Sequence, residues 1–160
     1  MSEKTVRPLD AYGALGWLRG RSDVDPDRIG LQGWSNGGMA GLWTMSTFRL
    51  TDRGMTAAEG FRAALIFYPS CSRLRDEEPA FKPYAPIRMF VAGEDKEVNP
   101  KTCVKFAHVV VEAGGPLQVI EFPEAHHDFD NPASKDAADK AAAAAARESA
   151  REFLAIELGS

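Results

Sequence analysis

Four short segments rich in apolar residues recur along the chain and predict buried strands. They are residues 29–32, 63–68, 87–92 and 117–122. Their apolar residues run continuously instead of alternating with polar ones, which is typical of strands that are covered on both faces. The pattern therefore favours a parallel sheet.

Stretches whose apolar residues recur at helical spacing separate these strands. One covers residues 7–19, and a second follows Ser35. Two more are expected where Asn99-Pro100 and Asn131-Pro132 each offer an N-cap residue followed by proline at the first helical position. Strands that alternate with helices predict an α/β fold built on a mainly parallel sheet of about four strands.

The composition limits the classes of protein that fit this pattern. A chain of 160 residues that is 44% hydrophobic can bury one core, so residues 1–160 are expected to form a single domain. The net charge of -4 and the scattered basic residues disfavour nucleic acid and membranes as partners. No apolar run is long enough to cross a bilayer, and the first residues lack the apolar segment of a signal peptide. We therefore expect a cytoplasmic protein that acts on a small neutral or weakly polar molecule.

Two cysteines bear on the redox environment. Cys71 and Cys103 each come after a predicted core strand, so the fold could bring them together. A disulfide between them would indicate an oxidising compartment. Because a signal peptide is missing, we favour two unpaired thiols.

The residues that join the first predicted strand to the following helix carry the clearest chemical signal. Gly33-Trp34-Ser35-Asn36-Gly37 fits the G-x-S-x-G pattern of a nucleophile elbow, which requires a strand before it and a helix after it. A side chain at Gly33 or Gly37 is expected to collide with the turn or with the neighbouring strand. A flexible turn is the competing interpretation of a lone serine between glycines. The flanking strand and helix favour a serine held out for chemistry, beside the N–H groups of its own helix.

Residues that could activate this serine follow the later strands. A serine nucleophile needs a base to take its proton and an acid to hold that base. Carboxylates follow the third predicted strand at Glu94, Asp95 and Glu97, and His126 and His127 follow the fourth. Open α/β sheets build their sites at these carboxyl ends, and the order serine, acid, histidine is that of α/β-hydrolases. The spacing alone leaves open which carboxylate and which histidine take part.

The same histidine segment also offers metal-binding atoms. They belong to His126, His127, Asp128 and Asp130. Neighbouring residues in a chain rarely converge on one ion, and no separate group of ligands supports such a site. We therefore expect no metal and no cofactor.

Beyond these motifs, the chain from about residue 7 onward resembles the dienelactone hydrolase family of α/β-hydrolases. The matching pieces are Asp27-Arg28-Ile29-Gly30 leading to Gly33-Trp34-Ser35-Asn36-Gly37-Gly38, Phe67-Tyr68-Pro69 with Cys71, residues 95–100, and residues 125–130 with Pro132. The resemblance implies Ser35 as the nucleophile, Asp95 as the acid and His127 as the base. Many family members use cysteine as the nucleophile. Ser35 therefore favours hydrolysis of small carboxylic esters or lactones through an acyl-enzyme.

The resemblance also concerns the oxyanion site. It implies that Asn36, through its backbone N–H, and Trp34 bind the oxyanion or the substrate. By this resemblance we expect the chain to correspond to the C-terminal half of the family's fold, whose other strands precede the elbow. A second oxyanion donor normally comes from that other half, and losing one donor costs on the order of 10²- to 10³-fold in rate.

The strands that precede the elbow in the family also bear on assembly. One of them flanks the elbow strand in the full fold, so here the outer edge of the elbow strand is expected to be bare. A two-fold homodimer that joins two such edges into one sheet would cover it. The main hypothesis is therefore an ester or lactone hydrolase. The alternative is a catalytically weak half-domain that serves as an assembly or interaction unit.

A charged segment, residues 70–86, is expected beside the site. Its notable side chains are Arg73, Arg75, Phe81, Lys82 and Tyr84. Such a segment could cover the site and select an acidic or aromatic substrate. It could equally be a solvated loop.

Overall fold

The computed structural model describes residue 2, residues 4–75 and residues 80–159. Within these residues the strands are β1 (Leu31–Trp34), β2 (Ala64–Phe67), β3 (Ile87–Ala92) and β4 (Leu117–Phe122). The helices are α1 (Arg7–Arg19), α2 (Asn36–Thr44), α3 (Thr47–Asp52), α4 (Ser72–Arg75), α5 (Pro100–Glu112) and α6 (Ala137–Leu158), with a short 3-10 helix at Ala57–Glu59.

All four strands run parallel and are hydrogen-bonded in the order β1-β2-β3-β4. The prediction of an α/β fold with a parallel sheet of about four strands is confirmed. Strands β3 and β4 have the predicted bounds, whereas β1 lies two residues further along the chain than predicted. Strand β1 forms one edge of the sheet, as expected for the strand that leads into the elbow.

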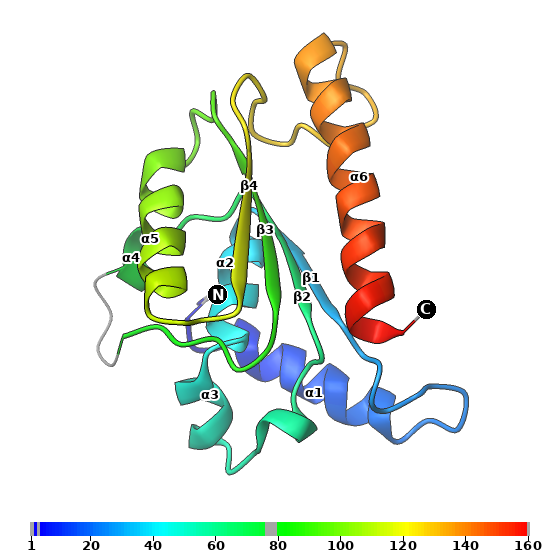
Figure 1. The fold of residues 1–160 in the computed structure, drawn as a ribbon. Coiled ribbons are helices and arrows are strands. Elements are labelled where there is room, and N and C mark those ends of the chain that lie inside the picture. Colours follow the sequence, from blue (N-terminus) through cyan, green and yellow to red (C-terminus); the bar gives the residue numbers. More distant parts are fainter. Residues whose placement is uncertain (1, 3, 76–79, 160) are drawn as a thin grey trace.

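Helices cover both faces of the sheet (Figure 1). Helices α1, α2 and α5 contribute to one core, which includes Leu15, Trp43 and Phe106. Helix α6 packs over the opposite face through Ala146 and Phe153. This two-sided cover explains why β2 is apolar at every position and why β3 has one polar residue. No helix within the described ranges is long and apolar enough to span a bilayer.

The two Asn-Pro pairs have different outcomes. Asn99 caps α5, and Pro100 is its first residue, as predicted. The prediction for the second pair is wrong, because α6 begins at Ala137, where the carboxylate of Asp136 accepts hydrogen bonds from two backbone N–H groups of the first turn. The side-chain oxygen of Asn131 instead accepts from a backbone N–H two residues on, which makes a local turn.

Cys71 and Cys103 form a disulfide, so the expectation of two unpaired thiols is wrong. Both residues are buried, and their Cα atoms lie 5.0 Å apart. The bridge ties the loop after β2 to the first turn of α5. The parallel order of β2 and β3 brings these two segments together, and that order is not visible in the positions of the cysteines in the sequence.

The aromatic residues of segment 70–86 belong to the core and not to a cover of the site. The ring of Phe81 packs on Phe106 of α5, with ring centroids 5.1 Å apart. The hydroxyl of Tyr84 accepts a hydrogen bond at 3.1 Å from a backbone N–H ahead of β2. The side chain of Arg75 lies outside the described part of the chain.

Candidate active site

The carboxyl ends of the four parallel strands lie together at one end of the sheet (Figure 1). Ser35 directly follows β1, Asp95 follows β3 and His127 follows β4. Because the strands are parallel, all three residues lie at the same end of the sheet, although the serine and the histidine are 92 positions apart in the sequence.

Ser35 lies on a sharp turn between β1 and α2. Its backbone has φ 49° and ψ -117°, a conformation that residues other than glycine rarely adopt. Its N–H donates to the carbonyl of Phe67 at 3.0 Å, and its own carbonyl accepts from the N–H of Met39 at 2.9 Å. Hydrogen bonds to the neighbouring strand and to the following helix thus hold the strained turn in place.

The turn requires glycine at Gly33 but not at Gly37. A Cβ atom at Gly33 would lie against the backbone carbonyl of Gly37, as expected. A Cβ atom at Gly37 would meet nothing within 4 Å, so the prediction for this residue is wrong. The second tight position is Gly38, where a Cβ atom would lie 3.0 Å from the carbonyl oxygen of Phe67.

The imidazole of His127 lies between Ser35 and Asp95. Its Nε2 is 2.9 Å from the Ser35 Oγ, and its Nδ1 is 2.6 Å from the Asp95 Oδ2. The side chain of Asp95 is only 1% exposed, and its Oδ1 accepts the backbone N–H groups of Glu97 and Val98 at 2.8 and 3.0 Å. These bonds fix the carboxylate, which in turn fixes the imidazole ring with Nε2 toward the serine.

The structure separates the alternatives that the spacing left open. Glu97 approaches Nε2 of His127, at 3.6 Å, and its side chain is 70% exposed. Glu94 is exposed at the surface. Nδ1 of His126 lies 3.2 Å from a carboxylate oxygen of Asp139. Neither glutamate therefore occupies the Nδ1 side of the ring, and His127 is the histidine in contact with the serine.

The structure groups His126 with Asp136 and Asp139, and not with the sequence neighbours that were considered as metal ligands. Donor atoms of the three residues lie within 4.8 Å of one another. Asp139 accepts hydrogen bonds from the His126 backbone and from the Ser134 hydroxyl, both at 2.9 Å. Burial acts to raise the pKa of Asp139, but these hydrogen bonds outweigh it and lower the pKa. The group fastens the histidine loop to the start of α6.

A polar bridge beside His127 is not apparent from the sequence. Asp130 accepts a hydrogen bond from the indole N–H of Trp34 at 2.7 Å and another from the hydroxyl of Tyr68 at 2.5 Å. The ring centroid of Tyr68 lies 4.7 Å from that of His127. Burial, together with the hydrogen bond to Asp130, raises the pKa of Tyr68 far above its usual value, so the hydroxyl stays protonated. The one signal in the sequence is a tyrosine placed directly after a buried strand.

The two residues expected to bind the oxyanion or the substrate flank the serine. Asn36 is the first residue of α2, so its backbone N–H is one of those that a helix leaves without an internal partner. Such N–H groups favour a negative charge nearby. Trp34 is 43% exposed. The assignment of Asn36 as an oxyanion donor stays a prediction.

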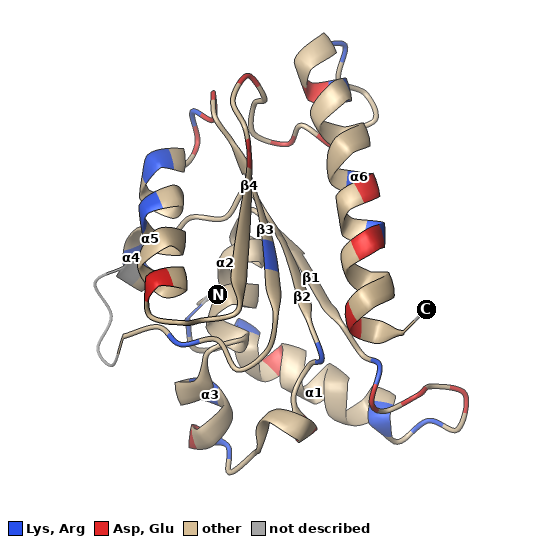
Figure 2. Ribbon diagram, viewed as in Figure 1, with Lys and Arg blue, Asp and Glu red and all other residues tan. Residues whose placement is uncertain are grey.

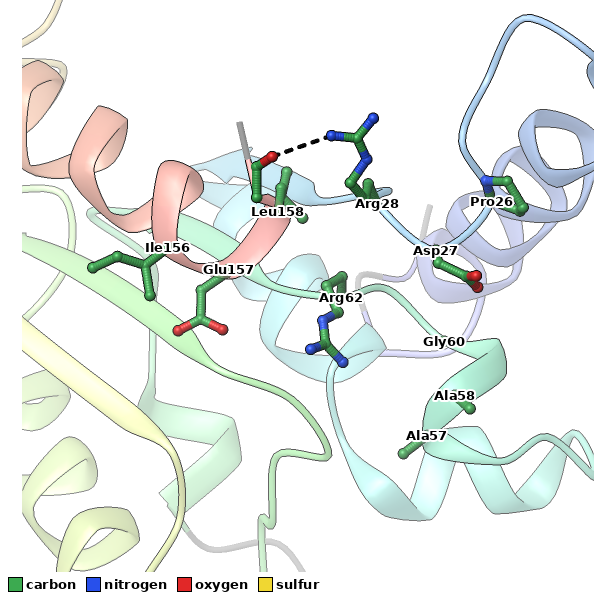
Figure 3. Close-up of a pocket in the computed structure, with 11 residues that line it drawn as sticks. Pro26, Asp27, Arg28, Ala57, Ala58, Gly60, Arg62, Ile156, Glu157 and Leu158 are labelled. Carbon is green, nitrogen blue, oxygen red and sulfur yellow. Dashed lines mark hydrogen bonds between the residues drawn. The ribbon is translucent and has the colours of Figure 1, made fainter.

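A hollow of about 490 Å³ lies at the opposite end of the sheet, where the strands begin (Figure 3). It is lined by residues that precede β1 and β2, such as Arg28 and Arg62, and by the end of α6 near Leu158. Arg28 donates a hydrogen bond to the carbonyl of Gly159 at 3.2 Å. This hollow faces the amino ends of the strands and takes no part in the site around Ser35.

Comparison with known sequences assigns the chain to a family. The sequence model of the dienelactone hydrolase family matches residues 2–158. The chain belongs to the dienelactone hydrolase family. No curated protein matches it significantly.

The fold of this dienelactone hydrolase family member is similar to those of solved α/β-hydrolases. The apo form of Thermogutta terrifontis esterase 2 has 25% identity and a TM-score of 0.70, over 92% of this chain and 63% of that one. Its butyrate-bound form has 24% identity and a TM-score of 0.65, over 91% and 65%. MGS-M1, an α/β hydrolase enzyme from a Medee basin deep-sea metagenome library, has 18% identity and a TM-score of 0.74, over 100% and 69%. The chain spans 62% to 65% of the length of these esterase 2 structures.

Proposed function

We propose that the chain hydrolyses small carboxylic esters or lactones through an acyl-enzyme on Ser35. The observation that carries the proposal is the imidazole of His127, whose two nitrogens lie at hydrogen-bond distance from the Ser35 hydroxyl and from the Asp95 carboxylate. Membership of the dienelactone hydrolase family and the likeness to esterase structures support it. The proposed reaction needs only these side chains, backbone N–H groups and water.

In the acylation step, Nε2 of His127 takes the proton of the Ser35 hydroxyl while Oγ attacks the ester carbonyl carbon. The carbonyl oxygen becomes an oxyanion beside the backbone N–H of Asn36. When the tetrahedral intermediate collapses, the bond to the alcohol breaks, and the leaving oxygen takes the proton back from Nε2. Asp95 stabilises the imidazolium that exists between the two proton transfers.

In the deacylation step, water replaces the alcohol. Nε2 of His127 removes a proton from a water molecule as its oxygen attacks the acyl carbon. The second tetrahedral intermediate releases the acid and returns the proton to Ser35. An N–H donor lost from an oxyanion site costs on the order of 10²- to 10³-fold in rate, so we expect a slow esterase if Asn36 acts alone.

The relatives suggest a direct chemical probe of Ser35. Thermogutta terrifontis esterase 2 has been solved phosphonylated by sarin and phosphorylated by paraoxon. We propose that paraoxon likewise phosphorylates Ser35, with loss of p-nitrophenol. Intact-mass measurement should then show one diethylphosphoryl group, and peptide mapping should place it on the elbow peptide.

The decisive experiment compares Ser35→Ala with Ser22→Ala in the hydrolysis of p-nitrophenyl acetate. Ser22 is an exposed serine in the turn ahead of β1, so its replacement makes the same chemical change away from the site. We expect Ser35→Ala to lower kcat/KM by about 10³-fold or more and to abolish the paraoxon adduct, with Ser22→Ala unaffected. Unchanged hydrolysis and labelling in folded Ser35→Ala would refute the proposal.

We further propose that the chain forms a homodimer through β1. Among the described strands, β1 pairs with β2 alone. The N–H of Leu31 donates to the carbonyl of Ala63 in the segment that leads into β2, so the N–H of Gln32, the next residue, points to the open edge. Light scattering should report a dimer for the wild type and a monomer for Gln32→Pro, which removes an outward donor. A wild-type monomer at all concentrations contradicts the proposal.

A further inference from the structure

A hollow of about 300 Å³ lies beside the elbow. Its lining consists of two aromatic side chains, two carboxylates, an amide and a proline: Trp34, Tyr68, Asp128, Asp130, Asn131 and Pro132. Neither lysine nor arginine belongs to this lining. Trp34 directly precedes Ser35, and the ring of Tyr68 is in contact with that of His127. Two lining residues are thus neighbours of Ser35 and His127, which are not themselves part of the lining.

The aromatic wall of this hollow is rigid before any ligand arrives. Asp130 holds the indole N–H of Trp34 with one oxygen and the hydroxyl of Tyr68 with the other. The ring of Trp34 also stacks on Phe67, with ring centroids 5.6 Å apart, yet 43% of the residue remains exposed. A large aromatic surface is thus kept in place and in contact with solvent.

Both charged residues in the lining of the hollow are acidic, although Asp130 also lines a neighbouring hollow with Arg147 and Arg151. Asp128 is exposed and supplies a carboxylate to the lining, next to that of Asp130. Glu97 places another carboxylate 3.6 Å from Nε2 of His127. The two loops beyond β3 and β4, residues 93–98 and 123–131, carry six aspartates and glutamates against one lysine. Figure 2 shows these loops coloured mainly for acidic residues.

We infer that this hollow binds an ammonium group, and that the preferred substrates are esters that carry a positive charge on the acyl or alcohol part. The inference rests on the proposed esterase function. An aromatic face next to carboxylates attracts a quaternary ammonium group through cation–π and Coulomb interactions. A carboxylate-bearing substrate meets like charges in the lining. The acidic substrates considered for segment 70–86 are therefore disfavoured.

Two esters of equal shape test the substrate class. Acetylcholine carries a quaternary nitrogen where 3,3-dimethylbutyl acetate carries a neutral carbon, so the pair differs in charge and not in size. Hydrolysis of both can be followed by titration of the acid released. We expect kcat/KM for acetylcholine to exceed that for the neutral ester by about tenfold at low salt, and the ratio to shrink toward unity at about 0.5 M NaCl.

A matched pair of variants assigns the preference to the hollow. Asp128→Asn removes a charge from the lining, and asparagine tolerates the positive φ of 62° at this position. Glu112→Gln removes the same charge at the far end of α5, about 18 Å along the helix from its start. We expect Asp128→Asn to lower the acetylcholine-to-neutral ratio by about threefold or more, and Glu112→Gln to leave it unchanged.

The outcomes separate this inference from the proposed function. Hydrolysis of both esters that depends on Ser35, with no preference for the cation, overturns the inference and leaves the esterase standing. A preference that is equal in Asp128→Asn and in the wild type also overturns it, because the charge then acts elsewhere. If neither ester is hydrolysed and paraoxon does not label the chain, the esterase proposal and the inference fail together.

Discussion

Replacing Asp95 by asparagine tests the proposed mechanism at a single proton. In the native structure Oδ1 accepts the N–H groups of Glu97 and Val98, and an amide oxygen can keep both bonds. The new NH2 group then faces Nδ1 of His127 and can only donate to it. Nδ1 must become the acceptor, so the proton of the neutral ring moves to Nε2. An Nε2 that already carries hydrogen cannot take the proton of Ser35.

The expected loss follows from this change of tautomer and from the burial of the group. The Asp95 side chain is 1% exposed, so water has little access to replace its charge beside the imidazolium. A serine hydrolase that loses the acid of its triad in this way slows by about 10⁴-fold. We expect a loss on the order of 10³- to 10⁴-fold in kcat/KM, or about 4–5 kcal/mol of transition-state stabilisation.

The assay compares Asp95→Asn with Glu94→Gln in the hydrolysis of p-nitrophenyl acetate. Glu94 is the adjacent residue and is exposed, so its replacement makes the same change of charge without touching the imidazole. Circular dichroism should show both variants folded. We expect Glu94→Gln to stay within about threefold of the wild type. The reasoning is refuted if Asp95→Asn keeps more than about a tenth of the activity, or if Glu94→Gln loses as much.

Three further predictions concern stability. Replacing Cys71 and Cys103 by alanine should lower the free energy of unfolding by about 3–4 kcal/mol, the chain-entropy value for a bridge across 32 residues, which a denaturant titration would measure. Gly33→Ala should lower the free energy of unfolding by about 1–3 kcal/mol because the new Cβ atom meets a backbone carbonyl. Gly37→Ala lies inside a helix with free space and should raise the free energy of unfolding by up to about 1 kcal/mol. Equal melting temperatures of the two variants would contradict this. The folded state lowers the pKa of Asp139, so the carboxylate contributes stability above its unfolded pKa of about 4 and loses it as pH falls through the folded pKa. The stability difference between the wild type and Asp139→Asn should therefore be largest near neutral pH and shrink below pH of about 4, and a difference independent of pH would count against the hydrogen bonds described.

Much of the sheet could be predicted because each strand is marked by a run of apolar residues in its own sequence. The apolar-rich runs at 87–92 and 117–122 match β3 and β4 to the residue, although Arg88 lies inside β3 and Gln118 and Glu121 lie inside β4. The start of α6 could not be predicted in the same way. Asn131 and Asp136 are both good N-caps, and the choice depends on Asp139, which must reach back to the histidine loop. That contact is tertiary, so local pattern gives no sign of it.

The candidate site shows the same division between local and long-range signals. Ser35 is marked by neighbours in the sequence, and the likeness to a family pointed to Asp95 and His127. The bridge from Trp34 through Asp130 to the next strand has no comparable signal, because 96 residues separate its first pair. The disulfide could not be predicted for a related reason: a signal peptide concerns the compartment of a protein, whereas the pairing of Cys71 and Cys103 depends on the order of the strands.

The sheet also explains why Tyr68 lies where it does. The ends of β1 and β2 are in register, with Trp34 opposite Phe67, so Ser35 and Tyr68 are the next residue on adjacent strands. The loop that carries His127 starts from β4 and must cross the ends of β3 and β2 to reach the serine. The Tyr68 ring occupies the end of β2, 4.7 Å from the imidazole, with its hydroxyl held by Asp130 in that same loop. One side chain thus contacts the imidazole and anchors the segment that carries it, which makes Tyr68 a positioning residue of the proposed site.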